Sequence, residues 1–221
     1  MKLVIYGTSS FSELMHRYFT NDSDYEVVAF TVDAPYKDRE SFCGKPVHDF
    51  DTIVDRCPPE SHRMFVSYGY RVMRNRRALF AKAKTAGYEL ANFIHPSVNR
   101  ENDFRTGQNN VLFPNVLVEP HARLGDNNFI WSNTLVGHNV TVGHHNFISG
   151  GVILSGKCRV DSLCFLGVGS IIIDGVHVAD ESHIVPGSVV FQDTAAHTKY
   201  TGSPARPLLK HEDTGIVIQK P

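Results

Sequence analysis

Imidazole side chains are concentrated in the middle of the chain. His121, His138, His144 and His145 all fall within residues 121–145. A neutral imidazole, whose ordinary pKa is about 6.5, is suited to take a proton from an attacking nucleophile. Three imidazoles together are also a ligand set for Zn²⁺, which lowers the pKa of its bound water. Residue types alone therefore leave two kinds of chemistry open, general-base catalysis and zinc-assisted catalysis.

The cysteines add no chemistry of this kind. Cys43, Cys57, Cys158 and Cys164 show no CxxC spacing, which would be typical of a metal or redox site. We expect four reduced thiols, as in a cytoplasmic protein.

A second place for chemistry lies near the start of the chain, where an apolar strand is expected to lead into a helix. Residues 2–6 (KLVIY) form an apolar run that ends at Gly7, as in a buried parallel strand. Ser10 and Glu13 fit a capping box, which predicts a helix that begins with Ser10 as its N-cap. The loop Gly7–Ser12 then lies at a helix N-terminus, where anionic and polar ligand groups are favoured.

The rest of the first half alternates between strand-like and helix-like segments. Strands are expected at 25–32, 64–67 and 90–94, and a helix rich in Arg, Lys and Ala at 71–86. Strands separated by helices predict a small parallel sheet in an α/β domain.

The second half repeats with a period of six residues. From Leu112 to Val190, every sixth residue is Leu, Ile or Val, which makes fourteen consecutive aliphatic positions. A six-residue period fits neither an α-helix nor an ordinary strand. It predicts a triangular solenoid in which three hexads close one coil of 18 residues and each aliphatic side chain points inward.

Two further positions of the hexad have a predicted role. Two residues before each aliphatic position, the side chain is small or branched, so Cys158 and Cys164 are expected to be packing residues. Asn128 and Asn146 fill the same position and are expected to form a hydrogen-bonded ladder. Glycine often follows the aliphatic position, and we expect it at corners that need unusual φ and ψ angles; the examples are Gly125, Gly137, Gly143 and Gly167.

Composition excludes other classes of protein. Lys and Arg number 22 against 23 Asp and Glu, without a basic run of five residues, which argues against a nucleic-acid partner. No run of 18 apolar residues predicts a membrane span. The first residues lack the cleavage site of a signal peptide, which favours the cytoplasm.

With these repeats, the chain resembles the hexapeptide-repeat sugar acyltransferases of the sialic-acid O-acetyltransferase and nucleotide-aminosugar N-acetyltransferase family. The resemblance covers about residues 2–208 and is carried by KLVIYGTSSFS, the junction FIHPSV at 93–98, the hexads and the ending TGSPARPL at 201–208. It implies a Rossmann-like α/β domain at 1–97 that binds a sugar nucleotide. It also implies a left-handed parallel β-helix at 98–208, a tail at 209–221, and a homotrimer that holds acetyl-CoA between adjacent β-helices, without a metal.

The catalytic residues follow from the same resemblance. The family's base is a histidine in a stretch N-T-x-x-x-H that is followed by Asp or Glu, and here the stretch runs from Asn133 to His138 and Asn139. His138 is therefore the expected general base, and the Asn139 carbonyl is expected to orient the imidazole without supplying charge. One coil later stands Gly156, whose backbone N–H is expected to donate to the oxyanion.

The binding residues are implied in the same way. The segments 165–170 and 202–206 resemble those near the pantetheine arm and the adenine and phosphates of CoA, and the N-terminal loop keeps only the first glycine of the family motif. The expected CoA-binding residues are Gly156, Gly167, Gly169, Gly202 and Arg206, and the expected substrate-binding residues are Gly7, Ser9, Ser10, Phe11 and Asp33.

The implied reaction is N-acetylation of a nucleotide-linked amino sugar, a precursor of bacterial surface glycans such as lipopolysaccharide O-antigen. Three alternatives stay open. The first is O-acetylation of a sugar. The second is a zinc enzyme like the β-helical carbonic anhydrases, although their paired ligands are five residues apart and the separations from His138 here are six and seven. The third is a non-catalytic sugar-nucleotide-binding protein, suggested by Asn139 and the lost glycines.

Overall fold

The computed structural model describes residues 1–101 and 104–218, and the chain divides into two compact units. The N-terminal unit comprises Met1–Gly69 and Ala78–Phe93, and the β-helix unit comprises Tyr70–Arg77 and Ile94–Pro221. The segment 70–77, which the sequence places within the N-terminal domain, is thus grouped with the β-helix. Within the described ranges, no helix has the length and apolar character needed to cross a bilayer.

The N-terminal unit is a Rossmann-like α/β domain, as the sequence predicts. Its five-stranded sheet has the order β3-β4-β2-β1-β5, and all neighbours are parallel except β3 and β4. The strands are β1 (Lys2–Tyr6), β2 (Glu26–Val32), β3 (Ser41–Phe42), β4 (Lys45–Asp49) and β5 (His62–Val66). The helices are α1 (Ser10–Asp22), η1 (Ala34–Tyr36), η2 (Phe50–Thr52), α2 (Ile53–Arg56) and, from Ala78 onward, α3 (Met73–Thr85).

The predicted capping box of α1 is wrong by one residue. Ser9, with extended φ and ψ angles, is the N-cap, and its hydroxyl accepts from the Ser12 amide while the Ser12 hydroxyl accepts from the Ser9 amide. A serine hydroxyl at the third helical position closes the box as a glutamate would, because either oxygen can reach back to the N-cap N–H. Glu13 instead lies in the first turn, near the positive end of the helix dipole.

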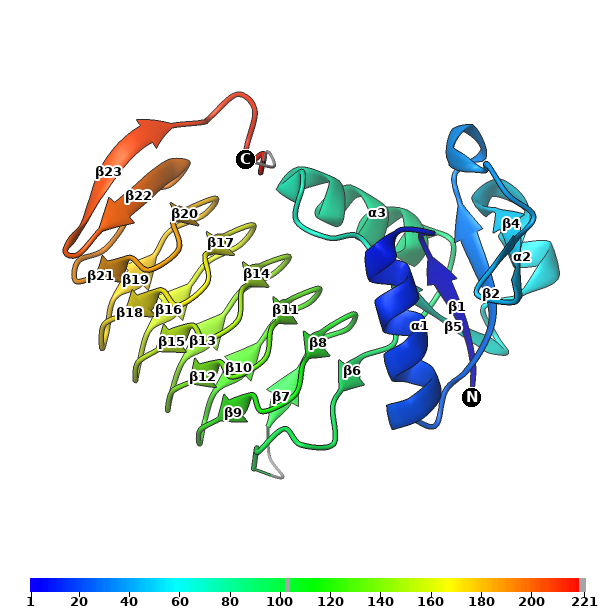
Figure 1. Ribbon diagram of the computed structural model, residues 1–221, viewed down its shortest axis with the longest axis horizontal. Helices are drawn as coiled ribbons and strands as arrows, with labels where there is room; N and C mark the ends of the chain where they lie inside the picture. The colour runs from blue at the N-terminus through cyan, green and yellow to red at the C-terminus, as the bar shows by residue number, and fades with distance from the viewer. Residues whose placement is uncertain (102–103, 219–221) are drawn as a thin grey trace. The chain divides into compact units, whose positions relative to one another are not determined.

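The β-helix unit is a left-handed parallel β-helix of three sheets (Figure 1). The first, the β12 sheet, contains β9 (Leu117–Val118), β12 (Leu135–Val136), β15 (Ile153–Leu154), β18 (Ile171–Ile172) and β21 (Val189–Val190). The second, the β13 sheet, contains β7 (Arg105–Thr106), β10 (Arg123–Leu124), β13 (Thr141–Val142), β16 (Arg159–Val160) and β19 (His177–Val178).

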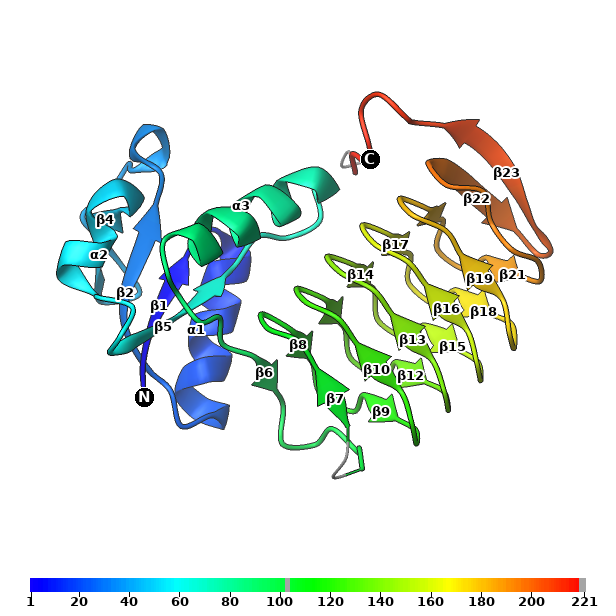
Figure 2. The same ribbon diagram turned by 180° about the vertical axis from the view of Figure 1, so that it is seen from behind.

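The third, the β14 sheet, is longer because it continues into a C-terminal hairpin. It contains β6 (Phe93–Ile94), β8 (Val111–Leu112), β11 (Phe129–Ile130), β14 (Phe147–Ile148), β17 (Phe165–Leu166), β20 (His183–Ile184), β22 (Thr198–Gly202) and β23 (Ala205–Lys210). Seen from behind, strands of the β12 and β13 sheets follow one another coil by coil (Figure 2). Paired residues are 18 apart, as in Phe129 and Phe147, so three hexads make one coil.

The interior of the β-helix confirms the hexad prediction. All fourteen aliphatic positions from Leu112 to Val190 are buried and pack into one core. The asparagine ladder also forms, and it joins side chain to backbone rather than side chain to side chain. The backbone N–H of Asn146 donates to the side-chain Oδ1 of Asn128 at 3.0 Å. The side-chain Nδ2 of each of these two residues donates to a backbone carbonyl of the adjoining corner. Asn110 adds one more rung. These bonds satisfy polar atoms that no water reaches.

The corners depend on a left-handed residue at every sixth position. From Asn115 to Gly187, the third residue after each aliphatic position has φ between +51° and +73°, and most of these residues are Asn, Gly or His. The glycines directly after the aliphatic position do not serve this purpose. A Cβ on Gly125 or Gly167 would meet backbone atoms of the next coil at 2.5 Å or 2.4 Å. They are required by close stacking of coils, so the predicted reason for these glycines is wrong.

One cation is fully buried in the β-helix unit. The Arg76 guanidinium lies 4.0 Å from the centre of the Phe129 ring, and it donates to the carbonyls of Asn127 and His145 at 2.7 and 3.3 Å. Its donors therefore tie the segment 70–77 to a corner of the β-helix.

Replacing Arg76 by Met is expected to lower the free energy of unfolding by about 3 kcal/mol, because the variant leaves buried carbonyls without a charged donor. Urea denaturation followed by circular dichroism measures the loss. The exposed Arg77→Met variant is the matched control and should stay within about 0.5 kcal/mol of the parent protein. Equal urea midpoints for the two variants would show that the buried guanidinium contributes nothing.

Candidate functional site

His138 lies at a corner where the chain passes from the β12 sheet to the β13 sheet. We call the column of turns between these two sheets the His138 corner; it contains residues 119–121, 137–139, 155–157 and 173–175. His138 is exposed, and its backbone N–H donates to Glu119 Oε2 at 2.8 Å. Its carbonyl accepts from the Lys157 amide of the next coil at 2.8 Å. The backbone is thus held on both sides while the ring stays accessible to a substrate.

Asn139 fixes one side of the imidazole. Its Oδ1 lies 3.1 Å from His138 Nδ1. A carbonyl oxygen only accepts, so the pair places the ring proton on Nδ1 and the lone pair on Nε2. The φ angle of Asn139 is +59°, a conformation that Asn adopts readily. Asn therefore serves the corner and the ring orientation together, but it brings no charge.

Gly156 stands directly beside the Nε2 atom of His138. A Cβ built on Gly156 would lie 2.4 Å from Nε2, so only glycine leaves the ring in this position. One coil earlier, the carboxylate of Glu119 caps the backbone N–H of His138. For Gly156, the residue that corresponds to Glu119 is Gly137, which has no side chain to act as a cap. Within the described ranges, the Gly156 N–H has no hydrogen-bond acceptor. The basic nitrogen and the uncapped N–H thus belong to residues that are neighbours in successive coils, and acyl transfer uses one group of each kind.

The structure adds two residues that the sequence analysis did not find. Glu119 caps the His138 backbone, and the Asp174 carboxylate lies 2.7 Å from the Cβ that Gly156 lacks. The coil length of 18 contains a signal for one of them. Asp174 is two coils from His138, so adding 36 to the position of the predicted base would have identified it. Glu119 is one coil and one residue away, and the coil length does not point to it.

The predicted CoA-binding residues do not all lie at the His138 corner. Gly167 and Gly169 lie at the next corner along, between the β14 and β12 sheets, where Gly169 has φ +66°. Gly202 ends β22 with φ +98°, and the exposed Arg206 lies opposite Thr201 in the β22–β23 hairpin. The β12 sheet separates these residues from His138, Asn139 and Gly156. The expected donor site thus spans both edges of this sheet.

The predicted substrate-binding residues surround the start of α1 in the N-terminal unit. Gly7 has φ +131°, and a Cβ there would meet the Ser12 hydroxyl at 2.9 Å, which explains why glycine is kept. Ser9 uses its hydroxyl as the N-cap, whereas Ser10 is exposed in the first turn. Phe11 is partly buried. The helix N-terminus therefore offers Ser10 and backbone amides to a ligand, and the Ser9 hydroxyl is already in use.

Asp33 ends β2 and belongs to a small polar cluster. Its Oδ1 accepts from the Tyr6 hydroxyl at 2.6 Å and from Lys82 Nζ at 2.5 Å. Burial acts to raise the pKa of Asp33, but the bonds from Lys82 and Tyr6 outweigh it and hold that pKa below its ordinary value. Burial and then Asp33 raise the pKa of Tyr6. Asp33 is thus ionised, and both donors use the same oxygen.

His144 and His145 lie at a different corner, between the β13 and β14 sheets. His144 is exposed, and its Nδ1 accepts from the Asp126 amide at 3.0 Å. His145 has φ +63° and is partly buried beside Arg76. Burial, followed by the charge of Arg76, lowers the pKa of His145 to about 4. Both imidazoles therefore have roles in the corner itself and are separated from His138 by the β13 sheet.

The buried thiols occupy the positions that the hexads predict. Cys158 and Cys164 are 1% and 0% exposed in the β-helix core. Burial raises the pKa of Cys158 to about 11 and raises that of Cys164 as well. Neutral, inaccessible thiols act as packing groups.

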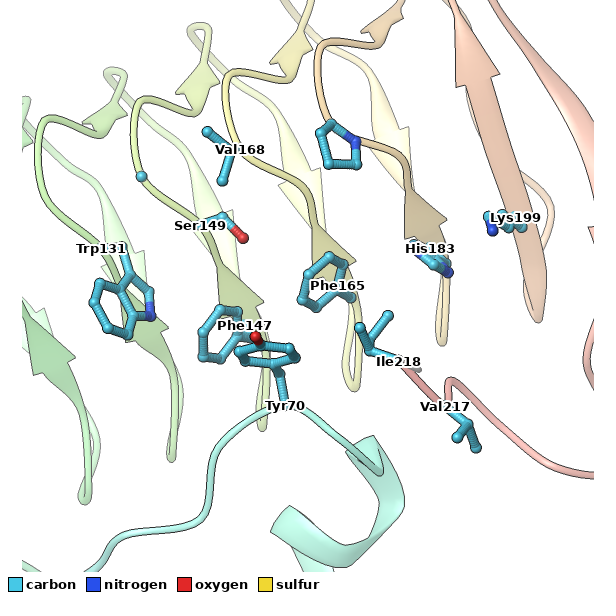
Figure 3. A pocket seen from close by; sticks show the side chains of 12 residues that line it. Tyr70, Trp131, Phe147, Ser149, Phe165, Val168, His183, Lys199, Val217 and Ile218 are labelled. Carbon is cyan, nitrogen blue, oxygen red and sulfur yellow. The ribbon is translucent and has the colours of Figure 1, made fainter. Parts of the chain in front are cut away.

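A cavity of 540 Å³ opens on the outer face of the β14 sheet. Figure 3 shows Tyr70 against Phe147, with Phe165 beside them and His183 and Lys199 further along. Burial, followed by Lys199, lowers the pKa of His183 to about 4. Of the predicted site residues, all of which the structure describes, none lines this cavity. The His138 corner is therefore a separate feature of the β-helix.

The repeats match a known family. A model of the bacterial transferase hexapeptide, described as six repeats, matches residues 121–156, the range that holds His138 and Gly156. No curated protein sequence matches the chain.

Solved structures share the fold over nearly the whole length of the hexapeptide-repeat chain. The perosamine N-acetyltransferase PerB of Caulobacter crescentus, solved with CoA and GDP-perosamine, is 25% identical with a TM-score of 0.82, and the match covers 94% of this chain and 97% of that one. The acetyltransferase domain of PglB from Neisseria gonorrhoeae, solved with acetyl-CoA, is 23% identical with a TM-score of 0.83, and the match covers 94% of this chain and 98% of that one. WeeI from Acinetobacter baumannii is 18% identical with a TM-score of 0.74, and the match covers 94% of this chain and 100% of that one. These matches and the hexapeptide model confirm the resemblance to hexapeptide-repeat sugar acyltransferases.

Proposed function

We propose that this protein is an acyltransferase that moves an acetyl group from acetyl-CoA to the amino group of a nucleotide-linked sugar. One observation carries the proposal. The His138 Nε2 atom lies against Gly156, whose N–H is uncapped, at an exposed corner, and Asn139 orients the ring. The complexes of PerB with CoA and GDP-perosamine, and of PglB with acetyl-CoA, support the choice of donor and acceptor.

The residues divide the reaction between them. The amine nitrogen attacks the thioester carbonyl carbon while His138 Nε2 takes the amine proton, so a C–N bond forms as the proton leaves. The Gly156 N–H donates to the carbonyl oxygen as it gains negative charge. The C–S bond then breaks, and the imidazolium returns its proton to the departing thiolate. The products are an amide and CoA with a free thiol, and no acyl group is attached to the protein.

The acceptor is proposed from the N-terminal unit. The diphosphate of a sugar nucleotide would suit the start of α1, where Ser10 is exposed and the backbone amides of the first turn favour an anion. Tyr6 and Lys82 both use Oδ1 of Asp33, so Oδ2 is the oxygen that would accept from a ribose hydroxyl or a base. A β-helix that acylated a free sugar hydroxyl would have no use for this unit, which favours N-acylation over O-acylation. Precursors of bacterial surface glycans are acceptors of this kind.

A homotrimer is proposed from the outer face of the β12 sheet. The outward residue of each of its strands is aliphatic, and none of these side chains is fully buried in the chain described here; they are Leu117, Leu135, Ile153, Ile171 and Val189. An apolar row of this length marks an interface between protein chains. Such an interface would bring the His138 corner of one subunit near the Gly169 corner of another. Sedimentation at three times the chain mass of 24.7 kDa would agree with it.

The four free cysteines fit a reducing compartment, and we therefore place the reaction in the cytoplasm.

The test is release of free thiol from acetyl-CoA in the presence of UDP-, dTDP- and GDP-linked 3- and 4-amino sugars. Turnover with one of them is the expected result and identifies acceptor and nucleotide together. Binding of CoA without turnover on the panel would favour the O-acetyltransferase alternative. If the protein neither binds CoA nor releases thiol, the proposal is wrong.

A further inference from the structure

The site that we propose has a base without a charged partner on its Nδ1 side. Asn139 Oδ1 is a neutral acceptor for the Nδ1 proton. When Nε2 takes a proton, the ring becomes a cation at an exposed corner. A neutral amide stabilises that cation far less than a carboxylate does, because a charge-assisted hydrogen bond is about twice as strong.

A carboxylate lies on the other side of the ring. A Cβ on Gly156 would stand 2.4 Å from His138 Nε2 and 2.7 Å from Asp174 Oδ1. The distance between His138 Nε2 and Asp174 Oδ1 is therefore at most the sum of these two distances. Gly156 leaves open the space between them, and the three residues follow one another in successive coils, 18 residues apart. An opposite charge at this range favours the protonated imidazole.

We propose that Asp174 is the carboxylate that stabilises the His138 imidazolium, acting at Nε2 where the position after the histidine supplies no charge. The inference rests on the proposed function, since it assigns a partner to the base of that reaction. Asp174 lies near the base rather than at the reacting carbon, so it is a positioning and charge-balancing residue. The proton still moves from the amine to Nε2 and then to the CoA thiolate.

The other charged or titratable groups at this corner do not fill the role. Glu119 uses its carboxylate to cap the His138 backbone N–H. Lys157 follows Gly156 in the next coil, and a cation there does not stabilise an imidazolium. His121 occupies the turn one coil before Asn139 and carries no negative charge. Among the described residues of this corner, Asp174 is the carboxylate that lies on the Nε2 side.

The experiment compares Asp174→Asn with the parent protein and with Asp180→Asn, a control at a neighbouring corner where the carboxylate accepts from the Ser162 amide. The first readout is an NMR titration of histidine labelled at Cε1, which needs no substrate. Loss of Asp174 should move the His138 midpoint to lower pH by about half a unit to one unit, because a carboxylate favours the charged ring. An unchanged midpoint overturns the inference.

The second readout is turnover on the acceptor that the panel identifies. Asp174→Asn should lower kcat by on the order of tenfold and move the acidic limb of the pH–rate profile to lower pH, with KM for acetyl-CoA within about twofold of the parent value. Adding Asn139→Asp should restore most of the loss, because it returns a carboxylate to the ring. A raised KM for acetyl-CoA with an unchanged pH profile would make Asp174 a donor contact only and overturn the inference.

The two readouts separate this inference from the proposed function. If Asp174→Asn moves the His138 midpoint but the parent protein releases no thiol, the transferase proposal is contradicted and the Asp174–His138 pair is established. Turnover by the parent protein with no effect of Asp174→Asn contradicts the pair and leaves the transferase intact. Thermal unfolding of each variant shows that the corner is still folded.

Discussion

Replacing His138 by Asn is expected to lower kcat by on the order of 10²-fold or more, with little change in the affinity for acetyl-CoA. The Asn side chain keeps a polar group at the corner but has no basic nitrogen within reach of an amine. The His138 side chain is exposed, so the free energy of unfolding should change by less than about 0.5 kcal/mol. Thiol release at saturating substrates measures the effect.

His144→Asn is the matched control for this substitution. His144 is also an exposed corner histidine, but it lies between the β13 and β14 sheets and accepts from the Asp126 amide, which an Asn oxygen can also do. Its kcat should stay within about twofold of the parent value. Sedimentation should show the same assembly for both variants. Parent-like turnover by His138→Asn would mean that another group is the base.

Adding one methyl group at Gly156 is expected to lower kcat by on the order of 10²-fold. In Gly156→Ala, the new Cβ would stand 2.4 Å from His138 Nε2 and 2.7 Å from Asp174 Oδ1, closer than any real contact allows. Both neighbours are the ends of flexible side chains, so they swing away and the β-helix stays folded. The base then leaves its position, and a displacement of about 1 Å can cost about 10²-fold in rate.

Gly69→Ala is the control for an added methyl group. Among the described residues, its Cβ would meet no atom within 4 Å, and Gly69 is not one of the predicted site residues. Both variants should unfold at nearly the parent temperature, and only Gly156→Ala should lose activity. Full activity in Gly156→Ala would show that the ring position seen here is not the reactive one.

The β-helix could be predicted from the sequence because each hexad carries two signals. The aliphatic residue of each hexad marks the inward side of a strand, and the residue three places later marks a left-handed corner. The N-terminal unit was less readable. Strand β4 contains a proline and a single buried residue, Val47, so its sequence lacks the apolar run that revealed β1 and β2.

The candidate site was readable only in part, for a similar reason. His138 and Asn139 are adjacent in sequence, and Gly156 is one coil away, so motif and period find all three. Glu119 caps the His138 backbone N–H only in a particular side-chain rotamer, which a sequence pattern does not predict. In the same way, two donors on one oxygen of Asp33 come from β1 and α3, 27 and 49 residues away in sequence.

The regular coil length also determines how substitutions in the second half of the chain affect one another. In a helix, neighbours are three or four residues apart, whereas here the residue most sensitive to a change at position i stands at i−18 or i+18. Double-mutant energies should therefore peak at these separations and be small in between. A single inserted residue would shift every later corner out of its column, whereas a whole inserted coil would preserve them. The natural unit of variation in this part of the protein is thus the complete turn, and length changes between relatives should come in steps of 18.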